Sequence, residues 1–344
     1  MDSITQAVLG AAIAEAGFRR ELGKRSLVFG AACGTFPDLD VISAAIDPWL
    51  DLLAHRGPSH SVLVLPVIAL LFGVLGARLG TKGSWRQWAH LAFWALVTHP
   101  LLDVFTSFGT QLLSPFSLRR FSFDAVSIVD PVYTLPMLAA VVAALFAGSA
   151  TWRIRTRRLT TLALGWGCLW IGVGVVNHSI AAGHTEAVLE QADFKPVAVR
   201  VMPLLFNHFA YRYAARDAEG RIAVGHASVT GQGASKPVIV VPEKGPLVDA
   251  ALQHPMGRRY AWFADDMLGI HTERLPGGLT RVHLQDLRYG KMTQPDKPLW
   301  EARFDVSADG EVVALDRDRR PDRDDQEMGP ELSELRAILL GERF

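Results

Sequence analysis

The chain has 344 residues, a length that allows about two domains. Its 35 Lys and Arg residues balance 35 Asp and Glu residues, and this zero net charge argues against a nucleic-acid-binding protein held by a basic surface. Hydrophobic residues make up 49% of the chain and the mean hydropathy is +0.19, and both values are high for a soluble enzyme. The composition therefore points away from a wholly water-soluble protein.

The apolar residues gather in four runs of the N-terminal half. The runs 57–77, 131–152 and 159–185 contain no Asp, Glu, Lys or Arg, and the run 87–118 contains only Asp103. A water-soluble domain does not hold four such runs. We therefore predict an integral membrane domain followed by a soluble part.

The predicted membrane domain is an all-α transmembrane helical bundle. Two short N-terminal helices are expected over residues 3–18 and 26–35. Four long spans follow, at about 62–77, 88–105, 133–148 and 160–181, each near the ~20 residues that a bilayer helix needs.

From residue 196 the pattern changes to short segments rich in β-branched and aromatic residues. This pattern predicts an antiparallel β domain, with strands at 197–201, 211–215, 222–230, 238–241, 260–264, 280–286 and 300–306. The charged run 316–325 is expected to be a solvated linker, and residues 331–340 a short helix. The predicted domains are 1–185, 186–315 and 316–344.

Basic residues predict the orientation in the membrane. They are concentrated in three turns, at residues 19–25, 78–86 and 153–158, whereas the intervening loops carry only Arg56 and the pair Arg119 and Arg120. If the two short helices also enter the bilayer, all three basic turns fall on one side, which the positive-inside rule makes cytoplasmic. The β domain is then expected on the outer side.

Four segments on that outer side carry polar or metal-ligand side chains, and the weakest of them, with Thr106, Thr110, Ser114, Asp124 and Asp130, could line a pocket, the alternative being ordinary loop residues. Asp38 and Asp40 are close enough in sequence to bind one or two cations, although a helix cap with a solvated acid is the alternative. His55, Arg56 and His60 flank a Gly-Pro turn before an apolar run, where the alternative is a polar turn at the membrane interface. In this motif Arg56 is suited to hold a phosphate or carboxylate.

The third motif is the strongest. His99 and Asp103 are four residues apart, so on a helix they lie on one face and can bind the same metal. Asp103 is the only formal charge in its apolar run, and such a residue marks a functional site. The alternative is a His–Asp hydrogen bond that holds helices together.

The ligand types indicate the chemistry. The sequence has no GxSxG, HExxH, Walker A or dinucleotide-binding motif. Asp and His ligands without Cys suit a hydrolytic divalent-metal site, most simply zinc, which lowers the pKa of a bound water and polarises the bond that is attacked.

The motifs at residues 1–5, 37–40, 55–61, 99–103 and 114–116 occur in an order that resembles the YdjM-type family. This family comprises bacterial inner-membrane proteins described as membrane-bound metal-dependent hydrolases, and it is considered a distant relative of zinc-dependent phospholipase C. The resemblance covers about residues 1–185. It implies a zinc ion held by Asp38 or Asp40 with His60, His99 and Asp103, and supporting or substrate-binding roles for His55 and Arg56.

The chain departs from the family pattern at Gln6, where the family has a histidine. Glutamine is a poor zinc ligand, so the resemblance then implies a site with one metal or a weakened site.

The predicted function is hydrolysis of an ester or phosphodiester, such as that of a lipid headgroup, at the outer face of the bacterial inner membrane. A carboxylate of the Asp38–Asp40 pair would take a proton from water, and Arg56 would hold an anion. The alternative is a non-catalytic membrane protein with a structural metal clamp and a β domain that binds a partner.

Overall fold

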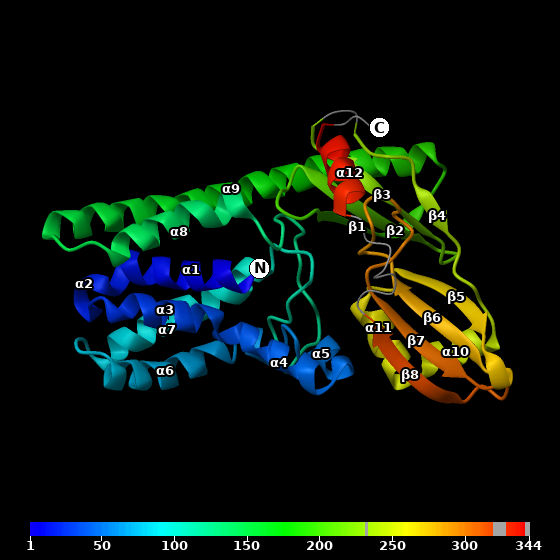
Figure 1. Ribbon diagram of the computed structural model, residues 1–344, viewed down its shortest axis with the longest axis horizontal. Helices are drawn as coiled ribbons and strands as arrows, with labels where there is room; N and C mark the ends of the chain where they lie inside the picture. The colour runs from blue at the N-terminus through cyan, green and yellow to red at the C-terminus, as the bar shows by residue number, and fades with distance from the viewer. Residues whose placement is uncertain (231–232, 319–327, 341–344) are drawn as a thin grey trace. The chain divides into compact units, whose positions relative to one another are not determined.

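The computed structural model describes residues 1–230, 233–318 and 328–340, and it divides into two compact units (Figure 1). Unit 1 comprises Met1–Val176 together with Leu205–His208. Unit 2 comprises Asn177–Leu204 and Phe209–Phe344. The division agrees with a helical N-terminal region and a separate C-terminal β region.

Unit 1 is a helical bundle, as predicted. Its helices are α1 (Ser3–Ile13), α2 (Arg19–Leu22), α3 (Arg25–Thr35), α4 (Ile42–Ile46), α5 (Pro48–Ala54), α6 (Leu65–Leu79), α7 (Trp85–Asp103), α8 (Pro131–Leu145) and the first part of α9 (Ala150–Gln191). A π-helical turn, Ala14–Phe18, joins α1 to α2, and 3-10 turns cover Phe36–Val41 and Pro58–His60. The last two turns lie between the second predicted short helix, 26–35, and the first predicted span, 62–77.

The prediction of four long spans is wrong. Among the described residues, two helical segments are long and apolar enough to cross a bilayer, Arg25–Ala44 and Ala150–Gln191, and the second contains the predicted span 160–181. A third is added if Trp49–His60 and Leu65–Leu79, which meet at a bend of 65°, form one span.

The lengths of the other helices explain the difference. Helices α6 and α8 each have 15 residues. A helix of that length is about 22 Å long, which is less than the ~30 Å of a hydrocarbon core. Gly57 and Pro58 open one charge-free run with a turn, so the apolar run is longer than the helix inside it. Helix α7 is longer, but it includes Arg86 and Asp103.

Helices α1 and α3 cross with their backbones in contact. A Cβ atom on Gly10 would overlap the carbonyl oxygen of Gly30, and one on Gly30 would overlap the carbonyl oxygen of Gly10. A Cβ on Gly34 would meet the carbonyl oxygen of Gln6. Small residues allow this close approach in membrane helices. The crossing brings Gln6 beside the C-terminal end of α3, where Asp38 follows.

Unit 2 contains two antiparallel four-stranded sheets, which confirms the predicted β region. One sheet has the order β1 (Pro196–Pro203), β2 (Ala210–Asp217), β3 (Ile222–Ser228) and β4 (Val238–Val240). The other has the order β5 (Leu268–Arg274), β6 (Thr280–Asp286), β7 (Glu301–Val306) and β8 (Val312–Asp318). The described residues of the unit also form the C-terminal part of α9 and the helices α10 (Pro246–Gln253), α11 (Pro255–Phe263) and α12 (Met328–Leu340).

Three expectations for unit 2 need correction. The predicted strand 260–264 falls on α11, a helix that begins at Pro255 and buries Tyr260 and Phe263, three residues apart, on one face. Strands β5 and β8 were not predicted, because their charged residues hide the alternation. The predicted linker 316–325 begins within β8, and its residues 319–325 lie outside the described residues.

Replacing Gly30 with alanine tests the close crossing of α1 and α3. Gly30→Ala is expected to lower the free energy of unfolding of unit 1 by ~1–3 kcal/mol, because the new Cβ forces the backbones apart. Thermal unfolding of the detergent-purified chain measures the effect. Gly165→Ala on α9 is the matched control, since nothing lies within 4 Å of a Cβ there. Equal unfolding temperatures for the two variants would contradict the crossing.

Candidate metal centre

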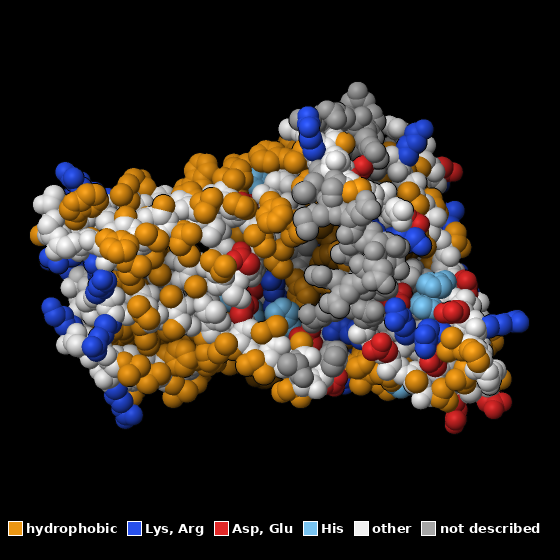
Figure 2. All heavy atoms as spheres, in the orientation of Figure 1, with side chains coloured by type: hydrophobic (Ala, Val, Ile, Leu, Met, Phe, Trp, Pro, Cys, Tyr) orange, Lys and Arg blue, Asp and Glu red, His pale blue; other side chains and the backbone are white. Residues whose placement is uncertain are grey.

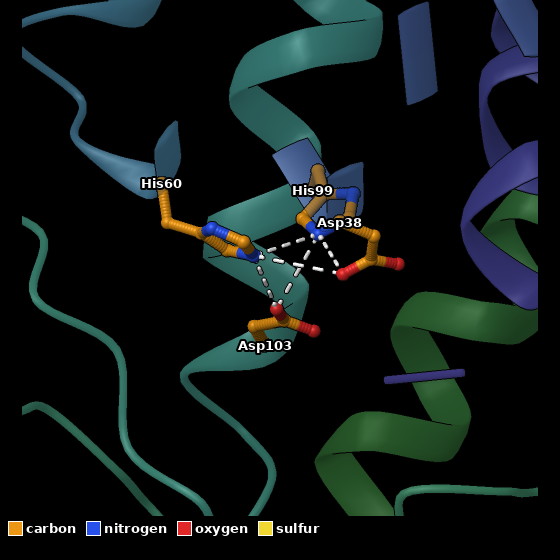
Figure 3. Close-up of side chains that lie close together, drawn as sticks. All are labelled: Asp38, His60, His99 and Asp103. Carbon is orange, nitrogen blue, oxygen red and sulfur yellow. Dashed lines mark hydrogen bonds and ion pairs between the residues drawn. The ribbon is translucent and has the colours of Figure 1, made fainter. Parts of the chain in front are cut away.

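Four side chains from three separate segments of unit 1 point toward one another (Figure 3). Asp38 comes from the 3-10 turn after α3, His60 from the turn Pro58–His60, and His99 and Asp103 from the last turn of α7. One ligand atom from each lies within 4.8 Å of the other three. Because these segments are distant in sequence, only the packing of the bundle brings them together.

Five of the six distances between the four ligand atoms are close to those of a tetrahedral metal site. His60 Nε2 lies 3.1 Å from His99 Nε2, and Asp38 Oδ1 lies 3.7 and 3.3 Å from these two nitrogens respectively. Asp103 Oδ2 lies 3.3 Å from His60 Nε2 and 3.5 Å from His99 Nε2. Zinc bonds of ~2.0–2.1 Å in a tetrahedron separate the ligand atoms by about 3.3 Å. The arrangement therefore fits a divalent ion.

The outer nitrogens of the two imidazoles are already occupied. His99 Nδ1 lies 2.5 Å from the carbonyl oxygen of Gly34, which can only accept, so this nitrogen carries the proton. His60 Nδ1 lies 3.0 Å from Ser59 Oγ and 3.2 Å from Asp40 Oδ2. Such contacts fix the tautomer and the ring orientation of histidine ligands. The Nε2 atom of His99 then offers a lone pair to the centre.

Asp103 has one oxygen held by the protein and one directed at the centre. Gln6 Nε2 donates to Asp103 Oδ1 at 2.9 Å and to the carbonyl oxygen of His99 at 3.2 Å, and the α-amino group of Met1 also contacts Oδ1. Asp103 Oδ2 is buried and has no hydrogen-bond partner. Arg56 Nε lies 3.3 Å from Oδ2 as an ion-pair partner but donates no hydrogen bond to it, and a buried carboxylate oxygen without a hydrogen-bond donor is costly. A cation at the centre would satisfy it, and Gln6 positions this ligand.

Asp40 lies outside the group of four. Its Oδ1 lies 2.8 Å from His55 Nδ1, and its Oδ2 accepts hydrogen bonds from the Arg56 backbone N–H at 2.9 Å and from Ser59 Oγ at 2.6 Å. The sequence left open whether Asp38 or Asp40 is the ligand. In the structure Asp38 lies at the centre. Asp40 lies outside it and stabilises the loop that carries His60 through these hydrogen bonds.

Arg56 is held beside the centre by contacts that the sequence did not reveal. Its Nη1 donates to Thr106 Oγ1 at 2.9 Å, and its guanidinium lies 5.1 Å from the ring centre of Phe108. Its Nε lies 3.3 Å from Asp103 Oδ2, and its backbone has a positive φ of 55°. The sequence marked Thr106 as a residue that could line a pocket, and it follows Asp103, the last residue of α7, by three positions.

Comparison with known proteins gives the family. The family model of the YdjM inner membrane protein matches residues 1–181, which is more than half of the chain. The chain belongs to this family. The match ends before most of unit 2, so the family assignment rests on the part that contains the candidate metal centre.

Two relatives are similar over part of their length. The inner membrane protein YbcI of Escherichia coli is 34% identical over 100 residues, which cover 28% of this chain and 57% of that protein. The uncharacterized protein YfhP of Bacillus subtilis is 28% identical over 108 residues, which cover 30% of this chain and 32% of that protein. The chain thus spans about a third of one relative and just over half of the other. No solved structure matches the chain.

Replacing Asp103 tests the centre without changing the size of the side chain. Asp103→Asn is expected to reduce bound divalent metal from about one ion per chain to near none, because the amide supplies no negative charge. Metal content is measured by mass spectrometry on detergent-purified protein.

The matched control is Asp130→Asn, which changes another buried carboxylate of unit 1. Asp130 caps α8 by accepting from the backbone N–H of Val132 and Tyr133, and asparagine is also a good cap. This variant should keep wild-type metal content. Equal metal content in Asp103→Asn and wild type would show that His99 and Asp103 only hold the helices together.

Proposed function

We propose that the chain is an integral inner-membrane hydrolase that depends on a divalent metal, most simply zinc, and cleaves an ester or phosphodiester. The observation that carries this proposal is the near-tetrahedral set of two imidazole nitrogens and two carboxylate oxygens. Membership of an inner membrane protein family supports the membrane location. A metal ion held there would supply Lewis-acid activation of water and of the bond under attack.

Asp38 is the ligand nearest to solvent. Its side chain is 12% exposed, whereas those of His60, His99 and Asp103 are fully buried. Its second oxygen, Oδ2, accepts one hydrogen bond, from Ser3 Oγ at 2.7 Å, and so keeps lone pairs free. Asp40 already accepts several hydrogen bonds. Of the two carboxylates, Asp38 is therefore the better placed to take a proton from an attacking water.

Arg56 is the proposed anion-binding group. Thr106 and Phe108 hold its guanidinium next to Asp103 Oδ2, and guanidinium groups recognise phosphate and carboxylate through paired donors. A phosphodiester oxygen bound here would lie beside the centre. The position of Arg56 therefore favours a phosphodiester over a neutral ester.

A second function has one observation in its favour. Four protein ligands fill a tetrahedral zinc site, and closed sites of that kind are structural, whereas catalytic sites keep an open position. In this alternative the metal clamps the bundle and unit 2 binds a partner. Catalysis requires that Asp38 be displaced or that a fifth position open beside it.

A hydrolysis assay separates the two functions. The metal-loaded wild type is expected to hydrolyse a chromogenic phosphodiester in detergent, to lose activity with a chelator and to regain it with Zn²⁺. Asp103→Asn should be inactive, and Asp130→Asn should be active. Metal-loaded protein that hydrolyses neither a chromogenic phosphodiester nor a chromogenic ester would favour the structural clamp.

We also propose that unit 2 is periplasmic. The basic segments 19–25, 78–86 and 153–158, the last of which lies in the first turns of α9, are at the same end of unit 1, the end with α2 and the α6–α7 and α8–α9 turns (Figures 1 and 2). The positive-inside rule makes this end cytoplasmic.

Reporter fusions test the orientation. A fusion after Arg155 is expected to be active as a cytoplasmic reporter, and a fusion after Gly310 in the β7–β8 turn is expected to be active as a periplasmic reporter. A cytoplasmic signal from the Gly310 fusion would overturn the orientation but would leave the metal centre untouched.

A further inference from the structure

We infer that the candidate metal centre lies inside the hydrocarbon layer of the membrane, in the leaflet remote from the basic turns, and that its substrate is a phospholipid that enters sideways from that leaflet. The assignment of a phospholipid substrate rests on the proposed function, whereas the depth of the centre in the membrane does not. The position of the centre along three helices gives its depth, and an exposed apolar surface around it gives the route of entry.

Three helices give the same depth. His99 lies 13 residues beyond Arg86 along α7. Asp38 lies 13 residues beyond Arg25, and Gln6 lies 13 residues before Arg19. At 1.5 Å per residue, each separation is at most about 20 Å along the bilayer normal, and any helix tilt shortens it. Basic residues at the membrane boundary therefore place the centre ~10 Å short of the far boundary of a ~30 Å hydrocarbon core.

Helices α6 and α8 are too short to cross the whole hydrocarbon layer. Other segments of unit 1 therefore lie in the leaflet remote from the basic segments. The 15-residue helices α6 and α8 begin on the side of the centre, at Leu65 and Pro131, and each is only about 22 Å long. Beyond the centre the chain forms the stretch 36–54 and the α7–α8 connection, residues 104–130. Both segments expose large apolar side chains, and the second also exposes Arg119, whose guanidinium lies 5.1 Å from the ring centre of Phe121.

These side chains form an apolar collar. The collar consists of Leu39, Val41, Ile42, Ile46, Leu113, Phe116, Leu118 and Phe123. Ile46 is 75% exposed and Phe116 is 84% exposed. Leu39, Val41 and Ile42 belong to the candidate span Arg25–Ala44, so the collar continues a surface already suited to lipid. The exposed apolar face of unit 1 extends along its helices in Figure 2.

Backbone N–H and carbonyl groups in the irregular segments of the collar form hydrogen bonds within the protein. Such hydrogen bonds are required where no water is available in the membrane. The N–H of Gln111 donates to the carbonyl oxygen of Arg56, and that of Val62 donates to the carbonyl oxygen of Leu112. Thr110 and Phe121 exchange two backbone hydrogen bonds. Non-helical backbone at membrane depth is tolerated when its polar groups are satisfied within the protein.

The exposed edge of the centre borders this apolar surface. Asp38, the ligand nearest to solvent, is followed by exposed Leu39, and Ser3, which donates to Asp38, is followed by exposed Ile4. A water-soluble substrate would have to cross this rim, whereas a phospholipid already has its acyl chains there. Water for hydrolysis has a separate polar approach past His55, whose side chain is partly exposed beside Asp40.

Spin-label depth measurements test the location. In a Cys33→Ala, Cys168→Ser background, Phe116→Cys and Ile46→Cys are labelled in phosphatidylglycerol–phosphatidylcholine vesicles. Both labels are expected to be more accessible to dissolved oxygen than to a water-soluble nickel chelate. Leu71→Cys on the apolar face of α6 is the control for a lipid-exposed site, and Glu219→Cys in the β2–β3 turn is the control for an aqueous site. Labels at 116 and 46 that behave like Glu219→Cys would overturn the inference.

The same vesicles test the substrate. Metal-loaded wild type is expected to release the headgroup or an acyl chain from the vesicle phospholipid faster, by at least tenfold, than it hydrolyses a soluble chromogenic phosphodiester at equal concentration. Hydrolysis of the soluble compound alone would overturn lateral entry while leaving the hydrolase intact. If the labels lie in the membrane but neither compound is hydrolysed, the proposed hydrolase activity and the phospholipid substrate are both wrong. The location of the centre inside the hydrocarbon layer would still stand.

Discussion

A fully buried carboxylate in an apolar helix requires cations or donors around it, and much of unit 1 is arranged to supply them to Asp103. Gln6 reaches it from α1, Arg56 from the loop after α5, and His60 from the turn before α6. Each of these contacts needs its own segment at one depth in the bundle. Gly10, Gly30 and Gly34 allow α1 to lie close enough to α3 for this, because side chains there would separate the backbones.

The same arrangement leaves two features that the protein alone does not resolve. Asp103 Oδ2 accepts no hydrogen bond, although Arg56 Nε lies 3.3 Å from it, and the Nε2 atoms of His60 and His99 face each other at 3.1 Å. A divalent ion resolves both, because it neutralises the carboxylate and accepts the lone pairs. Gln6 holds Oδ1 and leaves Oδ2 for the ion, which suits a single-metal site.

The short helices of unit 1 connect this chemistry to the membrane. Since α6 and α8 are shorter than a hydrocarbon core, the segments that carry Asp38, His60 and the collar continue beyond them. These segments cannot be regular helices, because Pro37, Gly57 and Pro58 turn the chain. These turns let three sequence-distant motifs meet.

The sequence by itself determined the helical N-terminal half, the antiparallel β region and the family, because apolar runs, alternation and ordered motifs are local signals. It also singled out Asp103, since a lone charge in an apolar run has a high desolvation cost wherever the run lies. Tertiary structure decided which of Asp38 and Asp40 faces the centre, and that Gln6 holds Asp103. Those outcomes depend on distances between segments that are far apart in the chain, and no local pattern encodes them. For the same reason the number of long spans was overestimated: composition marks an apolar run, but the packing of its prolines and glycines decides where the helix ends.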